Sequence, residues 1–354
     1  MPLISVISCY TRQLSRLWPL CVILCILFIT YRQLIFERQL NTAAITFDDF
    51  PPEYAEKLMA VQLQHNNTPD YIWPLVDTPL AEDQLTIPPI VHFIWFQNLY
   101  HDHLDVSMIP VAGSHAPGRC REYNPDFQLI MWNATMARQL IEDHYIWFLP
   151  TYDSYRYPIQ HVDALKYFVL YHFGGVYMDM DIACRRRLNP LLPFPAWFPK
   201  ASPFGVNNDL MASRARHPFF KFMLKQLITR NKNLLFPYLT IFWGTSPRFT
   251  TDMMKRWIFR GPSHDLGKHK SDLGADAVFV LPEEFYAEKY TSFGHSPGGT
   301  WYGKDVAVVL WLIDRPWLFA LVPAIPLLAY WIVLKVRLAR RKRNVICSLK
   351  TRRV

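Results

Sequence analysis

The sequence of 354 residues lacks low-complexity stretches and internal repeats, so a repeat architecture is excluded. It also lacks any spacing of cysteine and histidine that is typical of a zinc site. Apolar residues make up 51% of the chain, which is enough to bury a substantial core. We therefore expect a globular protein with one main folded domain.

The C-terminal tail, residues 335–354, has no acidic residue, so its basic residues alone account for the net charge of +9. The nine basic residues of the tail are Lys335, Arg337, Arg340, Arg341, Lys342, Arg343, Lys350, Arg352 and Arg353. The rest of the chain is consequently close to neutral. Because the basic charge is confined to a tail, the composition argues against a nucleic-acid-binding protein.

Two apolar segments predict membrane helices near the ends of the chain. Residues 17–31 are short for a span and resemble a signal anchor or the core of a signal peptide. We favour the anchor because residues 30–32, Thr-Tyr-Arg, do not form a small-residue cleavage site. Residues 316–334 carry no charge and run directly into the basic tail, which favours a transmembrane helix over a buried core helix.

The charges beside these segments predict the topology. The basic residues place both ends of the chain, residues 1–16 and 335–354, in the cytosol and everything between the spans in a lumen. Only Cys120 and Cys184 fall in this lumenal part, so one disulfide is possible there. Two glycosylation sequons, at Asn66 and Asn133, fit a secretory route.

The chain between the spans divides into a stem and a folded α/β domain. Residues 32–86 are rich in Pro, Asn and Asp and predict a stem or wrapping segment, which leads to a domain at residues 87–313. Strands are predicted at residues 90–96, 127–132 and 176–179, and helices at residues 136–148 and 161–173. Because strands alternate with helices, we expect a largely parallel sheet whose ligands bind at the carboxyl ends of the strands.

The pair Asp179 and Asp181 is the strongest candidate for chemistry. On an extended backbone two acids spaced i and i+2 point the same way, and such oxygen ligands select Mg²⁺ or Mn²⁺. A metal bridging the phosphates of a nucleotide sugar would offset the charge that develops on the leaving diphosphate. Taken alone, the pair is more often two solvated loop acids. The Gly-Gly turn at residues 174–175 and the Asp163 and Lys166 face of the preceding helix favour a site.

Several segments closely resemble glycosyltransferase family 32. The resemblance is strongest over residues 161–167 and 174–181, and it extends over roughly residues 87–305. The supporting segments are Pro89–Trp95, Asn124–Asp126 with Trp132, Asn208–Met211 and His217–Phe219. Within the family, the segments Asp179–Cys184, Leu188–Leu192 and Gly205–Met211 look most similar to the fungal enzymes that make mannosylinositol phosphorylceramide.

The resemblance implies a Rossmann-like catalytic domain of the GT-A type. It further implies retaining, metal-dependent transfer of mannose from GDP-mannose to inositol phosphorylceramide, a sphingolipid acceptor, at the Golgi membrane. A regulatory membrane subunit is a further expected partner. The alternatives are α-mannosyl or α-galactosyl transfer to a glycan, or a non-catalytic membrane subunit of a glycosyltransferase complex.

The resemblance also assigns site residues. Asp179 and Asp181 would hold Mn²⁺ or Mg²⁺, and together with Asp163, which would contact the donor sugar or ribose, they form the expected catalytic set. Residues expected to contact the donor are Trp95, Asp163, Lys166, Tyr167, Gly174, Gly175, Asn208 and Trp301.

Three positions depart from the family pattern. Lys166 stands where the family has Arg, and Ser246 stands where it has Gly. Tyr302 replaces a His that is a candidate metal or phosphate ligand, and the additional candidate metal ligands are Tyr302 itself, His295 and Asp305.

The C-terminal apolar segments favour a lipid acceptor. Even fully extended, the connection from Asp305 to Pro316 reaches less than about 40 Å, so a site that includes Asp305 must lie near the bilayer. Residues 306–313 are predicted to lie at the membrane interface, to form a final core strand, or to continue the span.

Overall fold

The structure is a computed structural model that describes residues 2–50, 52–56, 59, 86–96, 111–234, 236–259, 274, 276–286, 292–295, 304–313, 331, 333 and 335. The chain forms two compact units, Met1–Trp301 and Tyr302–Val354. The first unit contains the predicted α/β domain, and the described part of the second unit is mainly the helix α11 (Lys304–Ile313). Residues 306–313 are thus helical, and the alternative of a core strand is wrong.

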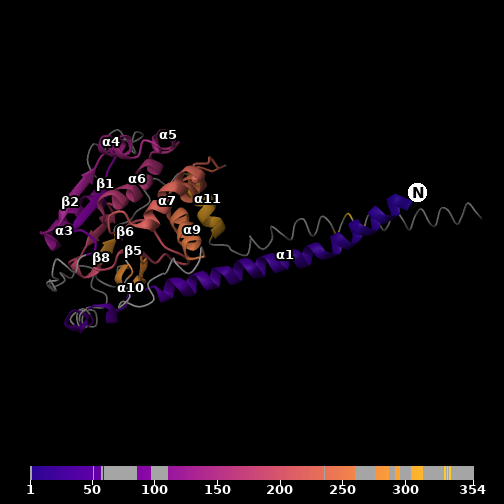
Figure 1. Cartoon of the computed structure of the whole chain (residues 1–354), viewed down its shortest axis with the longest axis horizontal. Coiled ribbons are helices and arrows are strands. Elements are labelled where there is room, and N and C mark those ends of the chain that lie inside the picture. Colours follow the sequence, from indigo (N-terminus) through magenta and orange to yellow (C-terminus); the bar gives the residue numbers. More distant parts are fainter. Residues whose placement is uncertain are drawn as a thin grey trace, which may run out of the picture. The chain divides into compact units, whose positions relative to one another are not determined.

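A six-stranded mixed sheet forms the centre of the first unit (Figure 1). In spatial order its strands are β2 (Gln128–Trp132), β1 (Ile90–Ile94), β3 (Gly175–Met178), β6 (Leu210–Ser213), β5 (Ala196–Pro199) and β7 (Phe279–Leu281). A separate pair of antiparallel strands consists of β4 (Ile182–Cys184) and β8 (Phe293–His295).

The predicted α/β class is confirmed, but the largely parallel sheet is wrong in one half. β1 is parallel to β2 and β3, whereas β6 is antiparallel to both β3 and β5. The reason lies in the connections. A parallel pair needs a long crossover, as the segment with the helix α3 (Val111–Tyr123) provides between β1 and β2, while β5 and β6 are joined by residues 200–209 without a helix.

Four consecutive helices beside the sheet begin at prolines, which are preorganised for the first helical position. They are α6 (Pro158–Phe173), α7 (Pro218–Arg230), α8 (Pro237–Gly244) and α9 (Pro247–Ile258), and Figure 1 shows α6, α7 and α9 together on one side. Their aromatic side chains, including Phe168, Phe219 and Phe249, fill the larger core cluster. α6 is the helix that brings polar residues into this core.

The remaining helices flank the sheet or lie at its edges. They are α1 (Pro2–Thr42), α3 (Val111–Tyr123), α4 (Ala134–His144), α5 (Leu149–Asp153), α10 (Glu283–Tyr286) and the short 3-10 helices Phe47–Asp49 and Asn189–Leu191. The end of α1 is part of the domain, because Phe36 and Leu40 are fully buried and Ile45 N donates to Val280 O of β7. Residues 36–45 therefore wrap the domain.

The structure describes one of the two predicted membrane segments and almost none of the other. Residues 17–31 lie within α1, whereas residues 316–334 lie almost entirely outside the described part of the chain. Among the described residues, no helix has both the length and the apolar character required for a membrane crossing.

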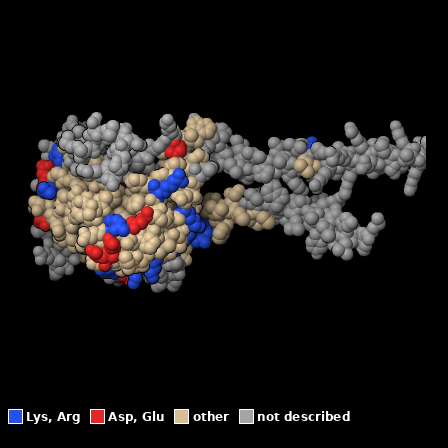
Figure 2. Space-filling model, turned by 90° about the horizontal axis from the view of Figure 1, so that it is seen from above, with Lys and Arg blue, Asp and Glu red and all other residues tan. Residues whose placement is uncertain are grey.

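Basic and acidic side chains alternate over the domain surface seen in Figure 2, with no large patch of one sign. This distribution agrees with a nearly neutral domain.

A disulfide joins Cys120 of α3 to Cys184 of β4, which confirms the pair that the sequence allows. The two residues are separated by 64 positions, so the bond closes a long loop in the unfolded chain. We expect the double variant Cys120→Ser/Cys184→Ser to lose about 4 kcal/mol of unfolding free energy, measured by urea unfolding. Reducing agent should destabilise the native chain and leave the variant unchanged; equal stability of both proteins without reductant would contradict the assignment.

Candidate active site

The strand β3 ends directly at the acidic motif. Gly174 caps the C-terminus of α6 and Gly175 begins this strand, with φ angles of 71° at Gly174 and 100° at Gly175. A Cβ at Gly175 would lie 2.6 Å from Ile90 O, and one at Gly174 would lie 2.7 Å from Ala215 N. Only glycine therefore lets the chain turn from α6 into the sheet here. The glycines lie at the end of β3 opposite to Asp179, about 13 Å away, so the structure does not bring them to the motif.

His92 fixes this turn from the neighbouring strand. The indole Nε1 of Trp132 donates to His92 Nδ1 at 3.1 Å, and His92 Nε2 lies 2.8 Å from Gly174 O. Because an indole N–H only donates, Nδ1 must be the acceptor, and Nε2 carries the proton that Gly174 O accepts. Burial lowers the pKa of His92 to about 4, so the ring is neutral at pH 7.

The burial of His92 predicts that the free energy of unfolding falls in acid. Burial also lowers the pKa of His217 to about 4, with a further contribution from Arg214. In the unfolded chain both rings bind protons near pH 6.5, so the unfolding free energy should be highest above pH 6.5 and fall as the pH drops toward 4. We expect a loss of about 3 kcal/mol per histidine. Urea unfolding between pH 4 and 7.5 measures this slope, which should be shallower in His92→Gln; an identical slope would contradict the account.

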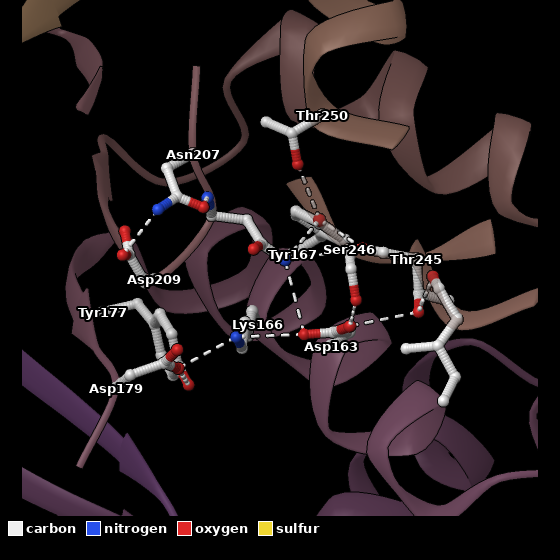
Figure 3. Close-up of polar contacts among 12 residues, drawn as sticks. Asp163, Lys166, Tyr167, Tyr177, Asp179, Asn207, Asp209, Thr245, Ser246 and Thr250 are labelled. Atoms are coloured by element: carbon white, nitrogen blue, oxygen red, sulfur yellow. Dashed lines mark hydrogen bonds and ion pairs between the residues drawn. The ribbon is translucent and has the colours of Figure 1, made fainter. Parts of the chain in front are cut away.

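Lys166 joins two acids at the centre of the site (Figure 3). Its Nζ lies 3.0 Å from Asp163 Oδ1 and 2.9 Å from Asp179 Oδ1. The side chains of Lys166 and Asp163 are 4% and 3% exposed, whereas Asp179 keeps 29% of its surface accessible. Asp163, Lys166 and Asp179 form an ion triad, and Asp179 is thus the member of this triad that faces outward.

The charges of the triad support one another. Burial alone lowers the pKa of Lys166, but Asp179, Tyr177 and Asp163 together hold it well above its ordinary value. Burial raises the pKa of Asp179 to about 6; Lys166 opposes this rise and Asp181 adds to it. Lys166 is therefore a permanent cation that favours the ionised form of Asp179 at neutral pH.

Asp163 is held by hydroxyl and amide donors from two segments. Thr245 Oγ1 donates to its Oδ2 at 3.1 Å, Ser246 Oγ donates to the same oxygen, and Asn208 Nδ2 donates to Oδ1 at 3.3 Å. The departure from glycine at Ser246 thus supplies a hydrogen bond to Asp163. Asp163 is 2% exposed, and the contacts described for it are to other side chains of the protein.

Tyr167 and Asn208 extend this network behind Asp163. The Tyr167 hydroxyl donates to Thr245 O at 2.6 Å, lies 2.8 Å from Thr250 Oγ1 and accepts from Asn208 Nδ2 at 3.1 Å. The structure therefore brings Asp163, Lys166, Tyr167 and Asn208 together. They form a buried network that supports Asp179, whereas the sequence had predicted that they contact the donor.

Several members of the network were not predicted from the sequence. Tyr177 donates to Asp179 Oδ1 at 2.5 Å, Asp179 N donates to Asp209 O at 2.7 Å, and Asn207 Nδ2 donates to Asp209 Oδ2 at 2.6 Å. A signal existed for the last two, because the polar run Asn207–Asp209 immediately precedes β6. Tyr177 reads from the sequence as an ordinary strand residue.

The carboxylates fit a divalent cation that completes its shell with substrate oxygens. Lys166 and Tyr177 both contact Oδ1 of Asp179, and no described side chain forms a hydrogen bond or ion pair with Oδ2. In the described part of the chain no three His, Cys, Asp or Glu side chains form a metal-binding group. Asp179 and Asp181 are the carboxylates of the motif that would hold such a cation, with phosphate and water oxygens supplying the rest of its shell.

The other predicted site residues have different positions. Trp95 directly follows β1, at the same edge of the sheet as Asp179, because β1 and β3 are parallel with His92 beside Tyr177. His295 pairs with Ile182 in the β4–β8 ladder, which places its backbone beside the acidic motif. Trp301 and Tyr302 lie outside the described residues, and Asp305 belongs to the second unit, whose placement relative to the first is not determined.

The fold and the site together define a class of protein. Its members are mixed α/β domains that carry an Asp-x-Asp pair at the carboxyl end of a central strand. The family model "Glycosyltransferase sugar-binding region containing DXD motif" matches residues 110–197, which include this pair. Inositol phosphoceramide mannosyltransferase 1 of Schizosaccharomyces pombe is 31% identical over 281 residues, covering 77% of this chain and 80% of that protein. The chain belongs to glycosyltransferase family 32.

Two further relatives are similar over shorter regions. Mannosyl phosphorylinositol ceramide synthase SUR1 of Saccharomyces cerevisiae is 37% identical over 215 residues, covering 60% of this chain and 53% of that protein. Inositol phosphoceramide mannosyltransferase 2 of S. pombe is 34% identical over 229 residues, covering 64% of this chain and 61% of that protein. The match thus spans little more than half the length of these two relatives.

Proposed function

We propose that this protein transfers mannose from GDP-mannose to inositol phosphorylceramide, with retention of configuration and dependence on Mn²⁺ or Mg²⁺. The observation that carries the proposal is the arrangement of Asp179, which Lys166 and Tyr177 hold through Oδ1, while no described side chain forms a hydrogen bond or ion pair with Oδ2. Family membership and the names of the similar fungal proteins support the sugar and the acceptor.

The residues have distinct roles in this proposal. Asp179 and Asp181 would hold the divalent cation, which would stabilise the negative charge of the departing GDP. Lys166 keeps Asp179 ionised and oriented, while Asp163 anchors Lys166 from the protein interior. Trp95, at the same sheet edge, is proposed to face the nucleotide.

The proposal includes a GT-A type catalytic domain facing the lumen of the Golgi, with both termini in the cytosol. On α1, large apolar side chains are more than half exposed: Ile23, Leu24, Leu27, Phe28 and Ile29. Such a surface supports contact with lipid. A regulatory membrane subunit remains part of the proposal as a partner.

Lipid analysis in cells that lack the native gene tests the function. Expression of the full chain should restore mannosylated inositol phosphorylceramide, detected by mass spectrometry. Asp179→Asn should not restore it, whereas Asp143→Asn, which changes an exposed acid on α4, should. Restoration by Asp179→Asn would favour a non-catalytic subunit instead. A change confined to protein-linked glycans would favour mannosyl or galactosyl transfer to a glycan.

A further inference from the structure

A large pocket lies beside the acidic motif, and most of the side chains that line it take no part in the polar network around Asp163, Lys166 and Asp179. It has a volume of about 930 Å³ and is bounded by α1, the β5–β6 connection, α8, α9 and the strand β8. Asn207 lines it and donates to Asp209, whose backbone oxygen accepts from Asp179 N. The pocket therefore adjoins the polar network of the catalytic motif, whose members Asn207, Asp209 and Asp179 are seen in Figure 3.

Three cations line this pocket, and they differ in their partners. Lys200 pairs with Glu37 of α1, and Arg248 Nε lies 3.1 Å from Asp252 Oδ1. Lys255 instead donates from Nζ to the neutral amide Oε1 of Gln33 at 2.8 Å, and no acid among the described residues forms an ion pair with it. Burial lowers the pKa of Lys255, as does the nearby Arg248, while Asp252 and Glu37 oppose this change from beyond ion-pair distance. An anion in the pocket would supply the direct ion pair that Lys255 does not form with a described acid.

The other polar groups of the lining suit a polyol next to that anion. Asn207, Ser202 and His295 present an amide, a hydroxyl and an imidazole, and Glu283 adds an exposed carboxylate. Amide and carboxylate groups bind sugar-like hydroxyls through hydrogen bonds. A phosphate on a ring of hydroxyls matches this combination better than an apolar ligand or a simple inorganic anion.

The helix α1 adds an apolar surface at the same place. Gln33 lines the pocket, and the residues just before it along α1 expose apolar side chains, including Phe28, Ile29 and Tyr31 at 59%, 64% and 62%. Phe204, which also lines the pocket, is 61% exposed. Exposed apolar surface next to a charged pocket is the arrangement that a lipid headgroup with its chains requires.

We infer that this pocket binds the phosphoinositol headgroup of the lipid acceptor, with Lys255 contacting its phosphate and the exposed apolar face of α1 contacting its chains. The inference deepens the proposed function and rests on it for the identity of the acceptor. Lys255 is then a residue that determines acceptor specificity, and the donor site is formed separately around Asp179 and Trp95.

Binding and kinetics of the full chain in detergent micelles test the inference. The probes are inositol phosphorylceramide and ceramide in mixed micelles, with binding measured by microscale thermophoresis. We expect the native chain to bind the phosphorylated lipid in preference to ceramide, and Lys255→Gln to weaken that binding about tenfold. Lys221→Gln, which changes an exposed lysine of α7 that does not line the pocket, should bind as the native chain does.

The kinetic arm separates the acceptor site from the donor site. Lys255→Gln should raise the KM for inositol phosphorylceramide about tenfold and leave the KM for GDP-mannose unchanged. Equal effects on both KM values, or unaltered lipid binding, would overturn the inference. Should Lys255→Gln fail to fold, Phe204→Asp places a negative charge at the exposed rim and should weaken lipid binding in the same way; unchanged binding by that variant would also overturn it.

The two proposals fail in different ways. If the native chain transfers no mannose but binds the phosphorylated lipid through Lys255, the proposed reaction is wrong and the acceptor pocket stands. If mannose is transferred and the loss of Lys255 changes neither lipid binding nor KM, the reaction stands and the pocket assignment is wrong.

Discussion

Replacement of Lys166 by methionine is expected to lower the free energy of unfolding by about 3 to 5 kcal/mol and to abolish measurable sugar transfer. Lys166 is the only described cation within 4 Å of Asp163 and Asp179, and its side chain is 4% exposed. Without it, Asp163 keeps its hydrogen bonds but loses its countercharge, and Asp179 loses the contact that orients it. Removing one partner of a buried ion pair leaves an uncompensated charge, which is far costlier than losing a surface pair.

Urea unfolding and a transfer assay on the same preparations measure both effects. Lys166→Arg is the matched control, because arginine keeps the charge and is the residue that the family pattern has at this position. We expect Lys166→Arg to retain most of the stability and activity. A methionine variant as stable and active as the native protein would show that the ion triad does not organise the site.

Asparagine at Asp179 or at Asp181 is expected to reduce kcat by about two to three orders of magnitude. Either change removes one of the two carboxylates proposed to hold the cation, while the side-chain volume is preserved. Asp181 has no hydrogen bond to a described side chain, so its loss should leave the fold intact. Asp179→Asn should cost some stability as well, because Lys166 then retains Asp163 as its single anionic partner.

Steady-state kinetics with varied Mn²⁺ concentration measures this loss, and circular dichroism with thermal unfolding confirms that each variant is folded. Asp143→Asn is the control for a change from acid to amide at an exposed position. If Asp181→Asn retained the native kcat and the native response to Mn²⁺, Asp181 would not be a metal ligand.

Local signals in the sequence predicted the centre of the site. The Gly-Gly turn, the short buried strand and the two acids occupy residues 174–181, so neighbouring positions along the chain determine their arrangement. The face of α6 that carries Asp163 and Lys166 was predictable from helical spacing in the same way. The α/β class followed from the alternation of strands and helices.

Long-range contacts account for what the sequence did not predict. Ser246 and Thr245 contact Asp163 across 83 and 82 positions, and no local pattern connects these segments. The same holds for the strand β6, whose direction depends on the connection from β5 rather than on its own residues. The burial of Asp163 and Lys166 likewise depends on how α6, α8 and α9 pack together. Because both side chains are buried, we interpret them as supports of Asp179 and no longer as contacts to the donor.

The most direct test of the account is the transfer of radiolabelled mannose from GDP-mannose to inositol phosphorylceramide by the full chain in detergent, with Mn²⁺ or with EDTA. The account predicts a mannosylated lipid that forms with Mn²⁺, disappears with EDTA and returns when excess Mn²⁺ is added. Transfer that proceeds equally in EDTA would contradict a metal held by Asp179 and Asp181, and the absence of any labelled lipid from folded protein would contradict the proposed reaction itself.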